Sequence, residues 1–437
     1  MKSELVAVVL AGGAGKRFWP LTADKILFPL LGETLIQFTV SAVLPKEVSR
    51  LVIIANDANY KSILGMRFPV PHVTIKQREA SGMADAILTA ESQLRGHRLL
   101  ILIADNLVPS TLLTAVIAKA GKAQAFAVVP GWKTPGYYPG GYLALKGDRI
   151  TEIREKPGEG NEPSKYINVS GHYIKSSELL LSALKETKSN EDDIYERALS
   201  NLMSHQNVIM EPYEGSTTSL KYPWHLLDVM VLLLGQLTPK RGKNVVIKPN
   251  VIIEGPVIIG DNVKIFENTK IVGPSYIGNN TIVGNNNMIR ASHIGDNCVI
   301  GFNCDITRSY IGNGCWLHSN YIGDSVLEAD VSLGSGTVLA NLRLDEGNIS
   351  SMVQGQRLST GRNKLGAIVG RGVRVGVNTS VMPGVKIGAR SFIGAGITLM
   401  RDIPDDSFGL AKTGYELVRN TGKSLDSARE EFRRKLG

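Results

Sequence analysis

The sequence predicts two structural halves: an α/β domain with a doubly wound, mostly parallel sheet, followed by a left-handed parallel β-helix of hexapeptide repeats. Three observations predict this fold class. The chain has 437 residues, too many for one ordinary hydrophobic core. Strand-like and helix-like segments alternate from residue 1 to about 235, whereas two long runs between about 245 and 405 have an aliphatic residue at every sixth position.

The first half contains buried strands that alternate with helices. The β-branched and Leu runs at 5–11, 51–57 and 99–106 end in turn residues, as buried strands do, and the stretches 36–43 and 84–94 have helical spacing. Strands that alternate with helices indicate a doubly wound, Rossmann-like sheet. Ligands bind at the carboxyl ends of the strands in such sheets. Gly12, Gly13 and Asp105 are therefore expected on one rim.

The second half has the period of a parallel β-helix. Glycine often follows the repeated aliphatic residue, as in IIGDN and YIGNN, and Gly or Asn permits the left-handed backbone near a corner. Each hexad predicts one flat side of a triangular prism whose core forms only when coils stack. The spacing of six holds at Ile247, Ile253, Ile259, Ile265, Ile271, Ile277, Val283 and Ile289, and again at Val369, Val375, Val381, Ile387, Ile393 and Leu399.

Three segments interrupt or bound this pattern. Residues 236–244 form a polar linker, and the polar stretch 341–366 must leave the prism as a loop. Residues 406–437 form a tail in which SLDSAREEFRRKLG predicts a helix with Ser424 as its N-cap.

The composition limits the classes of function. The net charge is +9, but the Lys and Arg residues are scattered and no nucleic-acid-reading motif occurs, so we expect anionic small molecules rather than nucleic acid as partners. No apolar run approaches the about 20 residues of a membrane span, and no signal peptide is evident. The three cysteines fit neither a zinc framework nor a disulfide scaffold. We therefore expect a cytoplasmic protein without membrane contact.

The stretch LAGGAGKRFWPLTADKILFPLLG (10–32) places a glycine-rich loop directly after a strand. Glycines let backbone N–H groups approach phosphate oxygens, and Arg17 and Lys25 add positive charge. The stretch resembles the signature of the sugar-1-phosphate nucleotidylyltransferases. This resemblance implies that the loop glycines and Arg17 hold a nucleoside triphosphate and that Lys25 contacts its phosphates; the glycines are Gly12, Gly13 and Gly15. Asp24 departs from the pattern, since proline is usual there.

Further segments match this family in the expected order. Gln77 and Gly82 in KQREASGMADA resemble the base-binding segment of members that use UTP or dTTP. Asp105 matches the family's Mg²⁺-binding aspartate, and a hard ion there would neutralise phosphate charge. The family's sugar-binding turn and Glu-Lys-Pro motif are matched by Gly141, Glu155 and Lys156, with Lys156 expected at the sugar phosphate.

Two departures concern this site. Asn168 in INVSGHY stands one position early relative to the family's asparagine. The usual second Mg²⁺ ligand lies in a Trp-x-Asp-x-Gly segment before a helix, and here SLKYPWHLLDVM has Ser219 at that position. Asp228 matches a helix residue rather than a ligand. The ion is then held by fewer protein groups or by another acid such as Glu214, and weakened or lost nucleotidyl transfer remains open.

The β-helix contains one candidate for acyl transfer. LHSNYIGDS (317–325) resembles the His-x-x-Tyr-x-Gly-Asp sequence of the bifunctional N-acetylglucosamine-1-phosphate uridylyltransferases and their archaeal counterparts. The resemblance implies that His318 is the general base for acetyl transfer from acetyl-CoA to an amino-sugar 1-phosphate, a task that suits imidazole. It also implies that Tyr321, Asn341 and Arg308 belong to the site and that the protein is a homotrimer.

Two alternatives remain at this stage. In one, only the nucleotidyltransferase half is active and the β-helix is a scaffold, as in some relatives of mannose-1-phosphate guanylyltransferase. In the other, the chain is a non-catalytic assembly subunit like the translation-factor exchange proteins. The presence of Arg17, Lys25, Asp105 and His318 opposes this last alternative, and Ser219 mildly supports it.

Overall fold

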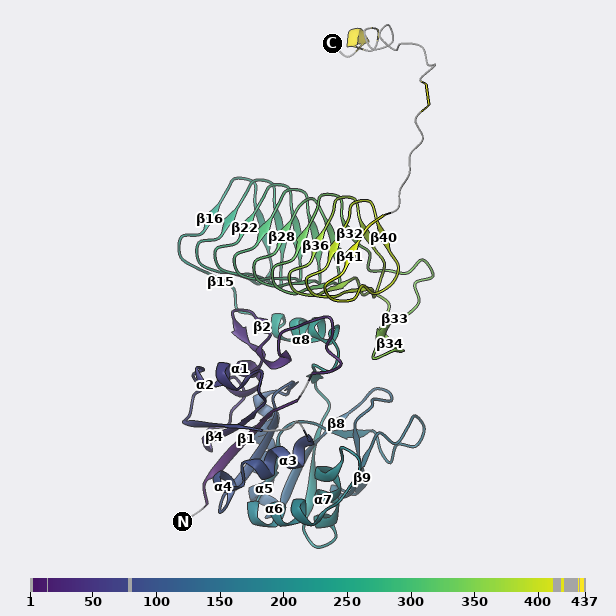
Figure 1. Ribbon diagram of the computed structural model, residues 1–437. Coiled ribbons are helices and arrows are strands. Elements are labelled where there is room, and N and C mark those ends of the chain that lie inside the picture. The colour runs from purple at the N-terminus through teal and green to yellow at the C-terminus, as the bar shows by residue number, and fades with distance from the viewer. Residues whose placement is uncertain are drawn as a thin grey trace.

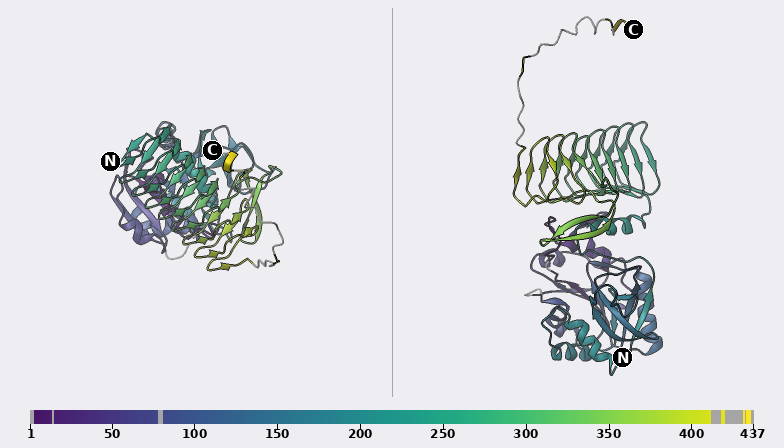
Figure 2. Two further views of the ribbon diagram at one scale, coloured as in Figure 1. Left: turned by 90° about the horizontal axis from the view of Figure 1, so that it is seen from above. Right: turned by 90° about the vertical axis from the view of Figure 1, so that its right-hand side faces the viewer.

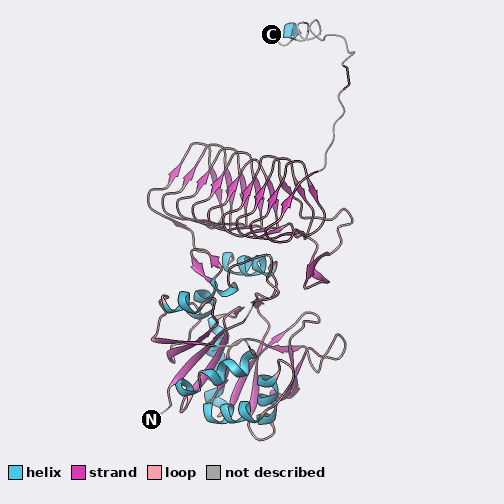
Figure 3. Cartoon of the chain, in the orientation of Figure 1, coloured by secondary structure: helices cyan, strands magenta, loops and turns pink. Residues whose placement is uncertain are grey.

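The computed structural model describes residues 3–13, 15–77, 81–411, 418–419, 431 and 433–435. An α/β domain occupies the N-terminal part and a prism of stacked coils the C-terminal part (Figure 1). Helices and strands alternate in the first domain, while the prism is built from strands (Figure 3). No helix of the described residues is long and apolar enough to cross a membrane. Ser424, the predicted N-cap, lies outside the described residues.

A ten-stranded sheet forms the first domain, in the order β11-β9-β10-β13-β8-β12-β6-β1-β4-β5. The predicted runs at 5–11, 51–57 and 99–106 correspond to β1, β4 and β6. The strands are β1 (Leu5–Ala11), β4 (Val48–Ala55), β5 (His72–Lys76), β6 (Arg98–Ile103), β8 (Ala127–Lys133), β9 (Gly141–Lys146), β10 (Arg149–Glu155), β11 (Tyr166–Asn168), β12 (His172–Ile174) and β13 (Val208–Tyr213).

The sheet is parallel where the glycine-rich loop begins. β6, β1, β4 and β5 run parallel, and β8 is parallel to β13. β12 lies antiparallel between β6 and β8, and β9, β10 and β11 pair antiparallel with their neighbours. The carboxyl ends of β1 and β6 therefore share one edge, which is the rim predicted for Gly12, Gly13 and Asp105.

Helices cover both faces of this sheet. Residues of α3, α4, α6 and α7 pack on one face and residues of α1, α2 and α5 on the other, with alternate residues of β1 facing each side. The predicted helix at 84–94 is divided at Ala90 into two. The helices are α1 (Leu35–Val40), α2 (Tyr60–Leu64), α3 (Gly82–Thr89), α4 (Glu91–Leu94), α5 (Ser110–Ala123), α6 (Ser177–Glu186), α7 (Ile194–Met203) and α8 (His225–Leu234).

Short elements complete the first domain near the rim. They are the 3-10 turn η1 (Lys25–Leu27), the hairpin of β2 (Pro29–Leu30) and β3 (Glu33–Thr34), and the pair of β7 (Asn106–Leu107) and β14 (Thr218–Ser219).

The prism has three sides, each a parallel sheet (Figures 1 and 2). Side one contains β15 (Lys240–Arg241), β18 (Val257–Ile259), β21 (Ser275–Ile277), β24 (His293–Ile294), β27 (Tyr310–Ile311), β30 (Val326–Leu327), β35 (Ile368–Val369) and β38 (Lys386–Ile387). Side two contains β16 (Val246–Ile247), β19 (Lys264–Ile265), β22 (Ile282–Val283), β25 (Val299–Ile300), β28 (Trp316–Leu317), β31 (Ser332–Leu333), β36 (Arg374–Val375), β39 (Phe392–Ile393) and β41 (Phe408–Gly409). Side three contains β17 (Ile252–Glu254), β20 (Lys270–Val272), β23 (Met288–Arg290), β26 (Asp305–Thr307), β29 (Tyr321–Gly323), β32 (Val338–Leu339), β37 (Ser380–Val381) and β40 (Thr398–Leu399).

The predicted hexad residues fill the prism. Ile265, Ile271, Ile277, Val283 and Ile289 are fully buried in one continuous core. Asparagines occupy the left-handed corners, as expected, and successive ones are linked by side-chain hydrogen bonds, such as the 3.0 Å bond from Nδ2 of Asn262 to Oδ1 of Asn280. Hydrophobic burial and these corner ladders together fix the left-handed β-helix.

The polar insertion forms a hairpin rather than an irregular loop. β33 (Ile349–Val353) pairs antiparallel with β34 (Gln356–Arg362), and the hairpin lies between the prism and the first domain (Figure 2). Its Ile349 and Val353 share an apolar cluster with Trp224 and Leu227 around α8. The hairpin therefore packs against the first domain.

Side one of the prism contacts the first domain directly. Tyr310 is fully buried, and its hydroxyl donates to the carbonyl oxygen of Pro29 at 2.8 Å. His293 stacks between Tyr276 and Tyr310, with ring centroids 4.9 and 4.6 Å apart. The two halves thus meet through a packed interface as well as through the chain connection.

Candidate nucleotidyl-transfer and acyl-transfer sites

Two adjoining cavities open at the carboxyl edge of β1 and β6. One has a volume of about 600 Å³ and reaches the glycine-rich loop, and the other, of about 730 Å³, extends toward β9 and β10. Arg17, Lys25 and Asp105 line both. The first cavity also contains Gly12, Gly13, Gly15, Gln77 and Gly82, and the second contains Gly141, Glu155 and Lys156. The structure therefore brings together every residue predicted for this site.

The glycine-rich loop approaches Gln77 closely. A Cβ atom on Gly12 would lie 2.3 Å from Oε1 of Gln77, and Gly15 has a φ of 62°. Gln77 is buried, and its Nε2 donates to Oδ2 of Asp85 at 2.6 Å. A larger residue at position 12 would displace Gln77 from the loop.

Asp24, which replaces the usual proline, organises the turn that precedes Lys25. Its Oδ1 accepts a hydrogen bond from the backbone N–H of Ile26 at 3.1 Å, and its Oδ2 accepts from Nδ2 of Asn56 and Asn59 at 3.2 and 3.0 Å. Asp24 thus ties η1 to the end of β4. Lys25 follows directly, and its Nζ forms an ion pair with Asp105.

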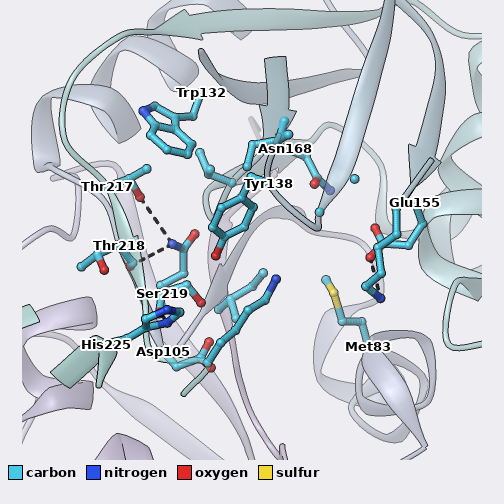
Figure 4. A pocket seen from close by; sticks show the side chains of 18 of the residues that line it. Met83, Asp105, Trp132, Tyr138, Glu155, Asn168, Thr217, Thr218, Ser219 and His225 are labelled. Atoms are coloured by element: carbon cyan, nitrogen blue, oxygen red, sulfur yellow. Dashed lines mark hydrogen bonds and ion pairs between the residues drawn. The ribbon is translucent and has the colours of Figure 1, made fainter. Parts of the chain in front are cut away.

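Asp105 stands beside Ser219. β14 pairs with β7 so that Ser219 lies opposite Asn106, and the backbone N–H of Leu220 donates to the carbonyl oxygen of Asp105 at 2.9 Å. Figure 4 shows Asp105, Ser219 and His225 at the same end of the cavity. A carboxylate at position 219 would therefore lie next to that of Asp105.

Neither Glu214 nor Asp228 takes the place of the second Mg²⁺ ligand, whose position is occupied by Ser219. Glu214 lines a separate cavity and forms an ion pair with Lys133 at 2.9 Å, which favours the alternative that fewer protein groups hold the ion over the one in which Glu214 is the second ligand. Asp228 forms an ion pair with Arg362. Within the described ranges, no three His, Cys, Asp or Glu side chains form a metal-binding group. The donor set fits Mg²⁺ in its usual form of one carboxylate plus substrate phosphates.

The far end of the larger cavity is narrow and polar. A Cβ atom on Gly141 would lie 2.7 Å from Oδ1 of Asn168 and 3.0 Å from Oε2 of Glu155. Asn168 is therefore part of the cavity despite its early position in the sequence. Lys156 Nζ lies 3.0 Å from Oε1 of Glu155. Figure 4 shows Glu155 and Met83 across the cavity from Asp105.

Several residues of the cavity were not predicted from the sequence. Lys221 lines both cavities, its Nζ donates to the carbonyl oxygen of Pro139 at 2.7 Å, and it lies 4.7 Å from the ring centroid of Tyr138. His172 is buried, its Nδ1 lies 2.7 Å from the hydroxyl of Tyr195, and burial lowers its pKa to about 4. The sequence did contain a signal for Lys221, because it stands where the Trp-x-Asp-x-Gly segment of the family has its glycine.

The β-helix also contributes to this site. Glu328 is buried, and its carboxylate accepts hydrogen bonds from the backbone N–H groups of Thr22, Ala23 and Arg371 at 2.9–3.1 Å. From the hairpin, Gln354 lines the cavity of the glycine-rich loop and Arg362 lines the larger one. These long-range contacts have no signal in a single sequence.

In the prism, three of the four predicted acyl-transfer residues form one hydrogen-bonded network. The hydroxyl of Tyr321 donates to Oδ1 of Asn341 at 3.2 Å, and Nδ2 of Asn341 donates to Oδ2 of Asp324 at 2.5 Å. Arg308 binds both oxygens of Asp324 at 2.7 Å, which raises the pKa of its guanidinium. Asp324, which was not predicted, is the residue that joins them.

His318 lies at the corner before β29 and is exposed. Its backbone N–H donates to Oδ1 of Asn320 at 2.6 Å, and its ring centroid lies 6.5 Å from that of Trp316. Among the described residues, its ring forms no hydrogen bond. Arg308 and Asp324 line an open cavity of about 610 Å³ together with Lys364 and Arg362.

Comparisons with known proteins match both halves. The family model described as nucleotidyl transferase matches residues 6–216, and the model described as bacterial transferase hexapeptide (six repeats) matches residues 256–291. The bifunctional sugar-1-phosphate nucleotidylyltransferase/acetyltransferase of Sulfurisphaera tokodaii is 31% identical over 413 residues, 91% of this chain and 98% of that protein. The bifunctional protein GlmU of Methanocaldococcus jannaschii is 31% identical over 420 residues, 92% of this chain and 96% of that protein.

These relatives extend over both halves of the chain, and the name of the Sulfurisphaera tokodaii protein states the two activities for which the sequence has candidate residues. The chain therefore belongs to the family of bifunctional sugar-1-phosphate nucleotidylyltransferase/acetyltransferases.

Proposed function

We propose that residues 1–235 transfer a nucleotidyl group from UTP or dTTP to a sugar 1-phosphate, and that residues 245–405 acetylate an amino-sugar 1-phosphate from acetyl-CoA. The observation that carries the first activity is the convergence of Arg17, Lys25 and Asp105 at the junction of the two cavities. One cavity has the glycine-rich loop that suits a triphosphate, and the other has the carboxylate and amide groups that suit sugar hydroxyls.

In nucleotidyl transfer, an oxygen of the sugar phosphate attacks the α-phosphorus, and pyrophosphate leaves with the electron pair of the broken bond. Arg17 and Lys25 bind the anionic phosphates, Lys156 binds the sugar phosphate, and Glu155 accepts hydrogen bonds from sugar hydroxyls. Gln77 and Gly82 hold the base. Mg²⁺, held by Asp105 and the phosphates, would neutralise the charge of the reacting groups.

In acetyl transfer, the amine of the sugar attacks the thioester carbonyl, a C–N bond forms, the C–S bond breaks, and coenzyme A leaves as a thiolate. His318 accepts the proton that the amine loses and returns it to the sulfur, which gives the free thiol. Tyr321 and Asn341 orient the acceptor, and Arg308, held by Asp324, provides positive charge for the sugar phosphate. The exposure of His318 supports a site that is completed by a neighbouring prism, and we infer that the protein is a homotrimer. We also infer that it is located in the cytoplasm.

Pyrophosphate release tests the first activity. The protein is incubated with Mg²⁺, with UTP, dTTP or GTP, and with glucose, glucosamine, N-acetylglucosamine or mannose 1-phosphate. We expect release with UTP or dTTP. Release with GTP and mannose 1-phosphate alone would favour the guanylyltransferase alternative, and no release with any pair would favour a scaffold.

Thiol release tests the second activity. Glucosamine 1-phosphate and acetyl-CoA are supplied, and free thiol is followed with a chromogenic disulfide. We expect the rate of thiol release to fall at least about 100-fold in His318→Ala, as for removal of a general base. His205→Ala, an exposed histidine of the first domain, is the control. Equal rates in the two variants would exclude His318 as the base.

A further inference from the structure

The segment that begins at the end of β14 differs from the family pattern at two positions that line one cavity. Ser219 replaces the carboxylate that would bind a metal, and Lys221 replaces the glycine two residues later. One negative charge is absent and one positive charge is added next to Asp105. The two substitutions change the electrostatics of the site in the same direction.

Lys221 has a position suited to an anion. It lines both cavities, as do Arg17, Lys25 and Asp105, so it lies between the glycine-rich loop and the sugar end. The reacting phosphates must meet at this junction.

The ammonium group of Lys221 makes its direct contacts with neutral groups. Its described contacts are the carbonyl oxygen of Pro139 and the ring of Tyr138, and no carboxylate of the described residues forms an ion pair with it. Burial and the nearby charges of Arg17 and Lys156 lower its pKa to about 8, and the more distant carboxylates of Glu155 and Asp105 only partly oppose this shift. A half-buried charge without a counter-ion is costly, and a bound phosphate would remove that cost.

We propose that Lys221 is a catalytic residue of the nucleotidyl-transfer site that donates hydrogen bonds to the reacting phosphates and supplies charge that a metal held by two carboxylates would otherwise supply. This inference rests on the proposed nucleotidyl transfer. During the step, the bond from the sugar-phosphate oxygen to the α-phosphorus forms and the bond to the bridging oxygen of pyrophosphate breaks. Lys221 keeps its protons throughout.

Nucleotide binding without turnover provides the first test. UTP is titrated calorimetrically in the presence of EDTA into the wild type, Lys221→Met, Lys221→Arg and Lys133→Met. Lys133 is the matched control, because it is an exposed lysine of the same domain outside both cavities. We expect the affinity for UTP to fall at least tenfold in Lys221→Met and by no more than about threefold in Lys221→Arg. The affinity should not change in Lys133→Met. Thermal melting and gel filtration establish that each variant is folded.

Restoring the family pattern provides the second test. In the double variant Ser219→Asp/Lys221→Gly, the second carboxylate returns and the ammonium is removed. We expect this variant to bind Mn²⁺ more tightly than the wild type in the presence of UTP, measured by electron paramagnetic resonance. We also expect its kcat/KM for pyrophosphate release to exceed that of Lys221→Met by at least tenfold at saturating Mg²⁺.

The outcomes separate this inference from the proposed function. Lys221→Met should lower kcat/KM about 100-fold, as expected for loss of one charged group at the transition state. If the wild type releases pyrophosphate and Lys221→Met equals Lys133→Met in binding and in rate, nucleotidyl transfer stands and the role of Lys221 is wrong. If the wild type neither binds UTP, dTTP or GTP nor releases pyrophosphate, the proposed function fails and this inference fails with it.

Discussion

Glu328 of the β-helix accepts hydrogen bonds from both the backbone N–H and the hydroxyl of Thr22, in the segment that follows the glycine-rich loop. The hydroxyl bond measures 2.9 Å. Because Glu328 is buried, these bonds are shielded from water and hold the segment to the prism.

We therefore expect Glu328→Gln to impair the nucleotidyl site from the opposite domain. The amide has one acceptor oxygen instead of two and would bring N–H groups against N–H groups, so the loop should loosen and kcat/KM for pyrophosphate release should fall about tenfold. Thiol release should be unchanged. Glu254→Gln, on the exposed end of the prism, is the control. Equal pyrophosphate release in the two variants would show that this contact does not position the loop.

Asp105→Asn should abolish most of the nucleotidyl transfer. The change removes the only cavity carboxylate proposed to bind Mg²⁺ and leaves Lys25 without its counter-ion. A loss of about 100-fold or more in pyrophosphate release is expected, and the Mg²⁺ concentration for half-maximal rate should rise. Asp148→Asn, at an exposed carboxylate of the same domain, should retain full activity. An unaltered Mg²⁺ requirement in Asp105→Asn would contradict the assignment.

Asp324→Asn should affect the acetyl-transfer half alone. Asp324 holds Arg308 with two hydrogen bonds and also binds Asn341, so its replacement removes the bidentate pair. We expect thiol release to fall about tenfold or more while pyrophosphate release stays within twofold. Asp330→Asn, an exposed aspartate on the next coil, is the matched control. Loss of both activities in Asp324→Asn would instead indicate misfolding of the prism.

Two buried histidines, His172 and His293, and the partly buried His225 should make the protein sensitive to acid. Burial lowers the pKa of His172, His225 and His293 to about 4, whereas an unfolded histidine has a pKa of about 6.5. Between these values the unfolded chain binds more protons. Stability is therefore fully present above about pH 6.5 and decreases as pH falls toward 4, by at most about 3 kcal/mol for each group.

His293→Phe tests this pH dependence. Phenylalanine can stack between Tyr276 and Tyr310 but does not titrate. The difference in melting temperature between pH 7 and pH 4.5 should be smaller in this variant than in the wild type, and His205→Phe, at an exposed site, should not change it. A full pH difference in His293→Phe would show that His293 does not contribute.

The sequence was most informative where structure is encoded locally. Each coil of the prism is specified by its own residues, so Ile271 and Ile289 could be assigned to the core and Asn262 to a corner without knowledge of other coils. The strand ends predicted Asp105 at the rim, and the family resemblance predicted the other lining residues from Arg17 and Lys25 to Glu155, because these follow one another in short motifs.

Contacts between distant segments could not be predicted in this way. Glu328, Gln354 and Arg362 are polar residues of coils and of an insertion, and a single sequence does not indicate which surface they meet. The hairpin was expected only as a loop, because its polar residues lack a clear alternating pattern. Lys221 was a different case: its position in the family pattern was visible, but its neighbours Tyr138 and Pro139 come from the distant loop between β8 and β9.

The contact between Glu328 and Thr22 also bears on the order of folding. The two residues are 306 positions apart in the chain, so Thr22 leaves the ribosome long before its partner exists. A chain synthesised from the N-terminus can fold its ten-stranded sheet early, but the segment after the glycine-rich loop must wait until the coil that carries Glu328 has stacked. Maturation of the nucleotide-binding loop is thereby delayed until most of the prism has been synthesised.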